Sequence, residues 1–183
     1  MTVNELKKFA TDVRIETVKC LEARTFGHIG GCLSIADVLT VLYNGELKNI
    51  DPEDPKKSDR DMLVVSKGHA GPAVFATLAL KGYFPLDWLS TLCEGGTRLP
   101  SHCDRIRTPG IDASTGSLGQ GLSLANGFAH AAKIKNMKNR IYCLMGDGEI
   151  QEGQIWEAAM YAHQYKLNNL VGIVDWNKKQ IDG

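Results

Sequence analysis

Two short apolar runs in the second half of the chain are each followed by a polar turn. Residues 141–145 form the first run and residues 170–174 form the second, and the pattern between them predicts an amphipathic helix over residues 153–165. A strand, a helix and a strand of this length form a right-handed crossover, whose two parallel strands end at the same edge of one sheet. We therefore expect Asp147 and Asn177, which follow the two runs, to lie close together.

Capping signals predict two helices in the first quarter of the chain. Thr2 and Glu5 have the spacing of a capping box, and apolar residues recur on one helical face after them. Ser34 and Asp37 repeat that spacing before a second apolar stripe, which predicts a helix that ends near Gly45. Both helices are expected to serve as scaffold.

The middle of the chain predicts a further strand and further helices. Residues 62–65 have the pattern of a buried strand, and Pro72 begins a helix that continues to about Gly82. A short helix is expected around Trp88, and a longer one carries the apolar residues from 122 to 132. Strands that alternate with helices predict an α/β fold with a mostly parallel sheet and helices on both faces. In such a fold the site lies at the carboxyl ends of the strands.

Length and charge limit the possible classes of protein. The chain of 183 residues is long enough for a single domain, 1–183, and Lys plus Arg balance Asp plus Glu at 21 each. This balance gives no argument for nucleic acid or for an anionic membrane surface as a partner. No apolar run approaches transmembrane length, and the five cysteines contain no Cys-x-x-Cys pair. We therefore expect a cytoplasmic protein with reduced thiols.

The two predicted strand ends carry a candidate cation site. The carboxylate of Asp147 and the side-chain carbonyl of Asn177 are hard oxygen ligands, which suit Mg²⁺ or Ca²⁺ better than zinc. Because Mg²⁺ usually keeps several positions for waters and phosphates, two protein ligands predict a bound diphosphate. Gly146 and Gly148 have no Cβ, so the backbone can approach such a ligand closely. An Asp-Gly pair alone most often makes a tight turn, but the second strand end with its asparagine favours the cation site.

Three histidines lie in predicted loops. His28 belongs to a glycine-rich segment at 24–31, His69 lies in the turn after the predicted strand at 62–65, and His102 lies in a later loop. Ligands of parallel sheets sit beyond the carboxyl ends of the strands, which places His69 on the same edge as Asp147. A three-histidine zinc site of a hydrolase is an alternative. It would leave Asp147 without a role, and the histidines do not have the spacing of metal ligands.

The stretch Gly-Asp-Gly-Glu-Ile-Gln-Glu-Gly at 146–153, followed by Asn177 and by Ile-Asp-Gly at 181–183, closely resembles the thiamine diphosphate motif of transketolases. The resemblance covers most of the chain and is closest to the amino-terminal subunit of split transketolases. It implies a thiamine diphosphate-binding fold. By this resemblance the metal ion is bound by the side chains of Asp147 and Asn177 and by the backbone carbonyl of Lys179.

The resemblance also assigns residues around the cofactor. It implies that His28, His69, His102 and Glu152 are catalytic residues, with the histidines at the reacting centre and Glu152 in a carboxylate network across a subunit interface. The backbone of the glycine-rich loop around Gly116 would lie against the aminopyrimidine ring. The cofactor-binding residues implied in this way are His69, Gly116, Ser117, Leu118, Gly146, Asp147, Gly148, Glu149 and Asn177.

A transketolase transfers a two-carbon ketol unit from a ketose phosphate to an aldose phosphate, as in the pentose phosphate pathway. The resemblance implies that this chain needs a pyrimidine-binding partner subunit, which supplies the glutamate that activates the cofactor. The expected assembly has two copies of each subunit, with thiamine diphosphate and Mg²⁺ or Ca²⁺ as cofactors and sugar phosphates as substrates. The resemblance also implies that the diphosphate-binding domain at 1–183 is truncated at its C-terminal end. A family remnant without catalytic activity is the remaining alternative.

Overall fold

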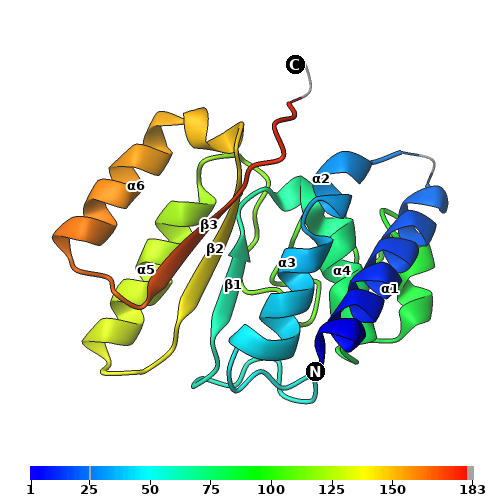
Figure 1. Ribbon diagram of the computed structural model, residues 1–183, viewed down its shortest axis with the longest axis horizontal. Coiled ribbons are helices and arrows are strands. Elements are labelled where there is room, and N and C mark those ends of the chain that lie inside the picture. Colours follow the sequence, from blue (N-terminus) through cyan, green and yellow to red (C-terminus); the bar gives the residue numbers. More distant parts are fainter. Residues whose placement is uncertain (25, 181–183) are drawn as a thin grey trace.

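The computed structural model describes residues 1–24 and 26–180, which fold around a parallel β-sheet (Figure 1). Within this part of the chain the sheet has three strands, in the order β1 (Met62–Val65), β2 (Ile141–Gly146) and β3 (Leu170–Asp175). β2 pairs in parallel with both neighbours, and Gly146 is the register partner of Asp175. The expected parallel strands are confirmed, and the polar residues that follow them share one edge of the sheet.

Two helices cover one face of the sheet, α5 (Gly121–Ile134) and α6 (Gly153–Gln164) (Figure 1). The side chains of β2 alternate between the two faces. Ile141, Cys143 and Met145 share a core with residues of α5 and α6, whereas Tyr142 and Leu144 belong to the core on the opposite face. Because both faces of β2 are buried, its sequence is a continuous apolar run.

The opposite face is covered by helices from the first half of the chain, namely α1 (Val3–Glu22), α2 (Ile29–Leu33), α3 (Ala36–Val41) and α4 (Gly71–Leu80). The expected capping box begins α1, since the hydroxyl of Thr2 accepts a hydrogen bond from the N–H of Glu5 at 3.3 Å. α1 packs against both α3 and α4. The expectation of helices on both faces is confirmed. None of the described helices is both long and apolar enough to cross a membrane.

Short helical turns complete the fold. The π-helical turn η1 (Leu42–Glu46) follows α3, and the 3₁₀ turn η3 (Leu86–Thr91) contains the short helix expected around Trp88. Two further 3₁₀ turns, η2 (Gly68–Ala70) and η4 (Glu149–Gln151), lie shortly after β1 and β2. These two turns shape the carboxyl edge of the sheet.

The predicted capping of a helix by Ser34 is wrong. α2 already begins at Ile29, within the segment expected to be a loop, and α3 begins at Ala36 with Ile35 as its N-cap. The hydroxyl of Ser34 instead donates a hydrogen bond to Oδ2 of Asp175 at 2.6 Å. A capping motif reflects only local spacing, whereas this hydroxyl is engaged by a contact with a distant strand.

A buried ion pair holds the start of β1, at the amino-terminal edge of the sheet. Nη2 of Arg60 contacts Oδ1 of Asp112, and Oδ2 of Asp112 accepts a hydrogen bond from the N–H of Leu63 at 2.7 Å. The side chains of Arg60 and Asp112 are 11% and 3% exposed. Burial raises the pKa of Asp112 above its usual value, although Arg60 opposes this shift. The pair stabilises the edge of the sheet away from the candidate site.

Candidate functional site

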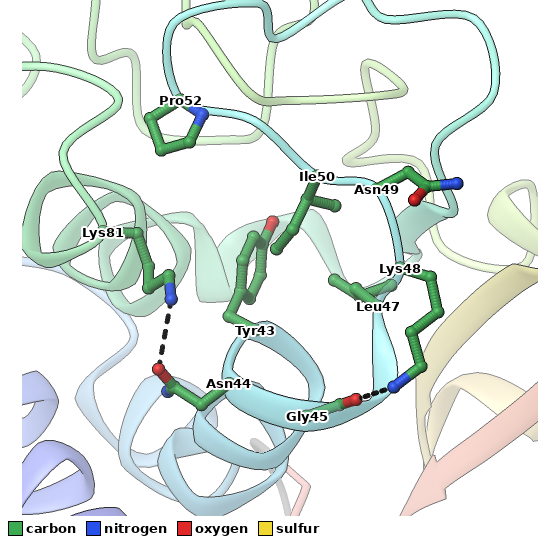
Figure 2. A pocket seen from close by; sticks show the side chains of 9 residues that line it. All are labelled: Tyr43, Asn44, Gly45, Leu47, Lys48, Asn49, Ile50, Pro52 and Lys81. Atoms are coloured by element: carbon green, nitrogen blue, oxygen red, sulfur yellow. Dashed lines mark hydrogen bonds between the residues drawn. The ribbon is translucent and has the colours of Figure 1, made fainter. Parts of the chain in front are cut away.

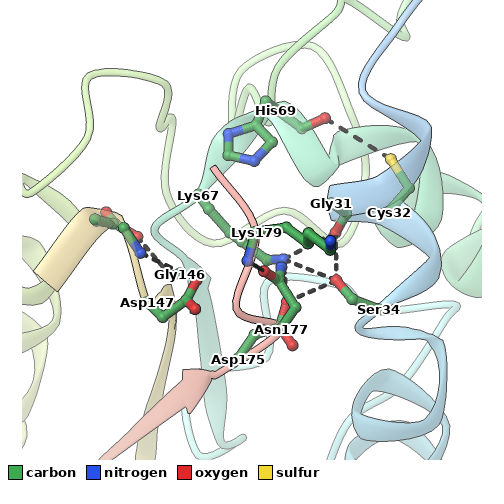
Figure 3. Close-up of polar contacts among 12 residues, drawn as sticks. Gly31, Cys32, Ser34, Lys67, His69, Gly146, Asp147, Asp175, Asn177 and Lys179 are labelled. Atoms are coloured by element: carbon green, nitrogen blue, oxygen red, sulfur yellow. Dashed lines mark hydrogen bonds and ion pairs between the residues drawn. The ribbon is translucent and has the colours of Figure 1, made fainter. Parts of the chain in front are cut away.

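Polar residues from three strand ends converge at the carboxyl edge of the sheet (Figure 3). Lys67 and His69 follow β1, Asp147 follows β2, and Asp175 and Asn177 lie at the end of β3. The backbone N–H of Asp147 donates to the carbonyl of Asp175 at 3.2 Å, so the pairing of β2 with β3 continues into the site. The loops that carry Asp147 and Asn177 therefore lie side by side, as the crossover argument predicts.

The carboxylate of Asp147 is held by backbone amides. Its Oδ2 accepts a hydrogen bond from the N–H of Lys178 at 2.8 Å, and its Oδ1 accepts one from the N–H of Gly148 at 3.0 Å. Lys178 has a left-handed conformation, with φ of 58°, which turns the chain after β3 back towards Asp147. In the same turn Oδ1 of Asn177 accepts a hydrogen bond from the N–H of Lys179 at 2.8 Å.

This donor set fits a hard divalent cation. Within the described residues no cationic side chain forms an ion pair with Asp147, and each carboxylate oxygen has a further lone pair beyond its backbone contact. Carboxylate and amide oxygens suit Mg²⁺ or Ca²⁺. The third predicted ligand, the carbonyl of Lys179, belongs to the turn that carries Asn177. The end of the quoted motif, 181–183, lies outside the described residues.

An ionic contact at the centre of the edge was missed by the sequence analysis. Nζ of Lys67 lies 2.6 Å from Oδ2 of Asp175, and their side chains are 2% and 10% exposed. Burial acts to raise the pKa of Asp175, but hydrogen bonds from Lys67 and Ser34 outweigh it, and the pKa is lowered. The only signal in the sequence is that Lys67 and Asp175 lie two residues and one residue beyond apolar strand patterns.

The three predicted histidines come together at this edge. The ring centroid of His28 lies 5.0 Å from that of His69 and 6.3 Å from that of His102. Burial, and then the charges of His28 and Lys67, lowers the pKa of His69 to about 4, and burial also lowers the pKa of His102. At neutral pH the imidazole of His69 is therefore uncharged and can donate one hydrogen bond while it accepts another.

The geometry gives less support to a zinc site made from these histidines. Across residues 1–24 and 26–180, no group of three or more His, Cys, Asp or Glu side chains is arranged to hold a metal ion. Nδ1 of His102 instead lies 2.9 Å from the hydroxyl of Ser101. The hydrolase alternative also leaves the oxygen ligands at the ends of β2 and β3 without a role.

The glycine-rich loop before α5 packs closely against the turn after β1. A Cβ on Gly68 would lie 2.6 Å from the backbone carbonyl of Thr115. Gly116 has φ of 154°, and a Cβ there would lie 3.1 Å from the ring of His102. The missing side chain of Gly68 lets the turn after β1 approach the loop, and that of Gly116 lets the loop approach His102. The loop is therefore placed beside the histidines, where the resemblance implies cofactor contacts.

Five of the predicted site residues are exposed, namely His28, Ser117, Leu118, Glu152 and Lys179. Glu152 is the N-cap of α6, and its side chain makes no capping hydrogen bond. A Cβ on Gly119 would lie 2.9 Å from the Cβ of Glu152, so the glycine-rich loop contacts the start of α6. These exposed groups are accessible to another chain.

Glu149 differs from the other predicted cofactor-binding residues because its side chain is buried, at 3% exposure. Its Oε1 accepts hydrogen bonds from the hydroxyl of Ser66 and from the N–H of Gly119, the latter at 2.9 Å. Its Oε2 accepts one from the N–H of Gly146 at 3.0 Å. These contacts lie within the protein and join the three loops that shape the site.

A cavity of about 580 Å³ opens beside the candidate cation site. It is lined by Asp147, Ile150, Gln151, Trp156, Trp176 and Gln180. Another cavity, of about 360 Å³, lies near the end of α4, where Nζ of Lys81 donates to Oδ1 of Asn44 at 3.2 Å (Figure 2). Its lining contains none of the predicted site residues. The first cavity therefore adjoins the predicted chemistry and the second does not.

The chain is similar in sequence and structure to known transketolases. A family profile described as "Transketolase, thiamine diphosphate binding domain" matches residues 6–183. The chain is 52% identical over 179 residues to the 6-deoxy-6-sulfo-D-fructose transketolase subunit of Clostridium sp. (strain MSTE9). It is 44% identical over 185 residues to an apulose-4-phosphate transketolase subunit of Actinobacillus succinogenes.

These alignments cover 98% and 100% of the chain, but only 65% and 66% of the two relatives. The crystal structure of transketolase from Campylobacter jejuni matches with a TM-score of 0.94 and 36% identity, over 100% of this chain and 30% of that one. The chain therefore belongs to the transketolase family, in the part that forms the thiamine diphosphate binding domain.

Proposed function

We propose that this chain is the diphosphate-binding subunit of a thiamine diphosphate-dependent transketolase, with residues 1–183 in one domain. The reaction transfers a two-carbon ketol unit from a ketose phosphate to an aldose phosphate. The observation that carries the proposal is the position of Asp147 and Asn177 at adjacent strand ends, with three histidines at the same edge. The family match supports the same cofactor.

Asp147, Asn177 and the backbone carbonyl of Lys179 would hold Mg²⁺ or Ca²⁺, whose remaining positions suit diphosphate oxygens. When it is bound, thiamine diphosphate supplies the electron sink for carbanion chemistry. Gly146 and Gly148 would let the backbone approach the diphosphate, because neither residue has a Cβ. The loop that begins at Gly116 would contact the aminopyrimidine ring.

His28, His69 and His102 would bind hydroxyl groups of the donor sugar and move protons there. Since the pKa of His69 is lowered to about 4, its imidazole is uncharged at neutral pH, so one ring nitrogen can accept a hydrogen bond from a hydroxyl group while the other donates one. Groups positioned in this way typically contribute about 10²- to 10⁴-fold to the rate. The histidines come from three different loops, so each can reach a different hydroxyl.

The proposed enzyme needs a pyrimidine-binding subunit, in an assembly with two copies of each chain. The two relatives described above are named as transketolase subunits, which supports a split enzyme. Exposed Glu152 beside the glycine-rich loop is available to such a partner. The proposed substrates are sugar phosphates. We place the reaction in the cytoplasm, since the five free thiols suit a reducing compartment.

A ketol-transfer assay tests the proposal. The chain, mixed with its complementary subunit, thiamine diphosphate and Mg²⁺, should convert a ketose phosphate and an aldose phosphate, whereas neither chain should do so by itself. Turnover by this chain in isolation would overturn the need for a partner. Absence of turnover by the assembled pair, with a range of phosphorylated ketoses, would overturn the transketolase activity.

A further inference from the structure

Lys67 is almost fully buried beside the site, with 1% of its surface exposed. A lysine is rarely buried in this way without partners, because its ammonium group loses hydration. Its Nζ donates to Oδ2 of Asp175 at 2.6 Å, to the carbonyl of Gly31 at 2.9 Å and to Oγ of Ser34 at 3.3 Å. Three acceptors satisfy the three N–H bonds, so Lys67 is fixed between β3 and α2.

Oδ2 of Asp175 connects this network to the candidate cation site (Figure 3). Besides Lys67, it accepts hydrogen bonds from Oγ of Ser34 at 2.6 Å and from Nδ2 of Asn177 at 3.1 Å. The side-chain amide of Asn177 is planar, with Nδ2 and Oδ1 on the same carbon. Oδ1 accepts a hydrogen bond from the N–H of Lys179 at 2.8 Å, so the hydrogen bond from Nδ2 to Asp175 is the second contact that sets the direction of this amide.

We propose that Lys67 and Asp175 are positioning residues for the metal ligand Asn177. Their ion pair holds Nδ2 of Asn177, and this would keep Oδ1, the atom able to coordinate, available to the cation. It also ties this amide to α2, the helix that follows His28. The inference rests on the proposed function, because it concerns the cation that would hold the diphosphate.

A purely structural ion pair makes a different prediction. Replacement of a buried ion pair by apolar residues of similar volume is often neutral for stability. In that case the double variant Lys67→Met/Asp175→Leu would keep both the fold and the cation site. A positioning role predicts that the fold survives while Asn177 loses its orientation, because leucine offers no acceptor to Nδ2. Arg60→Met/Asp112→Leu is the matched control, since it removes a buried ion pair at the other edge of the sheet.

NMR spectroscopy of the ¹⁵N-labelled chain tests the hydrogen bond directly. The side-chain amide protons of Asn177, assigned by their loss in Asn177→Ala, should exchange slowly with water in the wild type. In Lys67→Met/Asp175→Leu these protons should exchange as fast as those of a free asparagine side chain. In the control Arg60→Met/Asp112→Leu their exchange rates should be unchanged. Lys67→Met/Asp175→Asn keeps an acceptor oxygen and should keep the slow exchange, so it decides the question if the leucine variant does not fold. Slow exchange in the leucine variant, or its loss in the asparagine variant, overturns the proposal.

Metal affinity measures the consequence for the site. Mg²⁺ is titrated calorimetrically into the chain assembled with thiamine diphosphate and its complementary subunit. Loss of a residue that orients a metal ligand typically lowers affinity by about 10- to 100-fold, which we expect for Lys67→Met/Asp175→Leu. When Asn177 is already replaced by Ala, Lys67→Met/Asp175→Leu should lower the Mg²⁺ affinity by less than about threefold, because the ligand that the ion pair orients is absent. Equal losses in both backgrounds overturn the positioning role. A wild type that binds no Mg²⁺ overturns the proposed function itself.

Discussion

Glu149→Ala removes an acceptor that three loops of the site share. Gly119 is buried and Gly146 is half-buried, and their N–H groups donate to this carboxylate at 2.9 and 3.0 Å. A buried donor without a partner costs about 1–3 kcal/mol, and a lost hydrogen bond whose donor can reach water costs about 0.5–1.5 kcal/mol. The buried hydroxyl of Ser66 also loses its acceptor, which adds to the loss. The expected loss in the free energy of unfolding is therefore at least about 2–4 kcal/mol, a large part of the roughly 5–15 kcal/mol typical of a domain.

Equilibrium unfolding in urea, followed by circular dichroism, measures this loss. Glu149→Gln keeps an acceptor for Ser66 and Gly119 but turns an NH₂ group towards the N–H of Gly146, so a smaller loss of about 1–2 kcal/mol is expected. Glu157→Ala, on the exposed side of α6, is the control and should change stability by less than about 0.5 kcal/mol. A loss below about 1 kcal/mol for Glu149→Ala would refute the reasoning, because it would mean that the loops satisfy their donors without Glu149.

The remaining predictions concern His69 and the glycine-rich loop. In the assembled enzyme, His69→Ala should lower kcat by about 10²-fold or more with an unchanged circular dichroism spectrum. His130→Ala should have little effect, and wild-type turnover by the His69 variant would make His69 a structural histidine. Because the pKa of His69 is lowered from 6.5 to about 4, the unfolded chain binds a proton below pH 6.5 that the folded chain binds only near pH 4. The free energy of unfolding should therefore fall as the pH is lowered from about 6.5 to about 4, and His69 should contribute no such change above pH 6.5. For His69→Gln, the free energy of unfolding measured in urea should fall less over this pH range than it does for the wild type. The same pH dependence in both proteins would contradict the lowered pKa of His69. Gly68→Ala would place a Cβ 2.6 Å from the carbonyl of Thr115, so it should lower stability by about 1–3 kcal/mol, and an unchanged thermal unfolding curve would contradict this contact.

Elements with local signals could be predicted from the sequence. The apolar runs at 141–145 and 170–174 become β2 and β3, because strands in the middle of a parallel sheet bury both faces and read as continuous apolar runs. The proximity of the Asp147 and Asn177 loops then follows from the crossover alone. Pro72 similarly lies in the first turn of α4, where its missing N–H is not needed.

Contacts between distant segments could not be predicted in this way. Lys67 and Asp175 are 108 residues apart, and no local pattern distinguishes a buried lysine in a polar turn from an exposed one. Ser34 shows the opposite error, because its capping spacing is a local signal and its hydroxyl is used by Asp175. The position of Glu149 after an Asp-Gly turn is typical of a surface residue. Its side chain is nevertheless buried, because it accepts hydrogen bonds from distant loops.

The central account is that the ends of β2 and β3 hold a diphosphate through a divalent cation. The most direct test is a calorimetric titration of thiamine diphosphate into the chain assembled with its complementary subunit, with Mg²⁺ and with a chelator in its place. The account predicts binding by the wild type only with Mg²⁺. It also predicts loss of that binding in Asp147→Ala, whose circular dichroism should be unchanged because, among the described residues, the Asp147 carboxylate forms hydrogen bonds only with loop backbone. Undiminished binding by Asp147→Ala, or equal binding by the wild type with the chelator, would contradict the account.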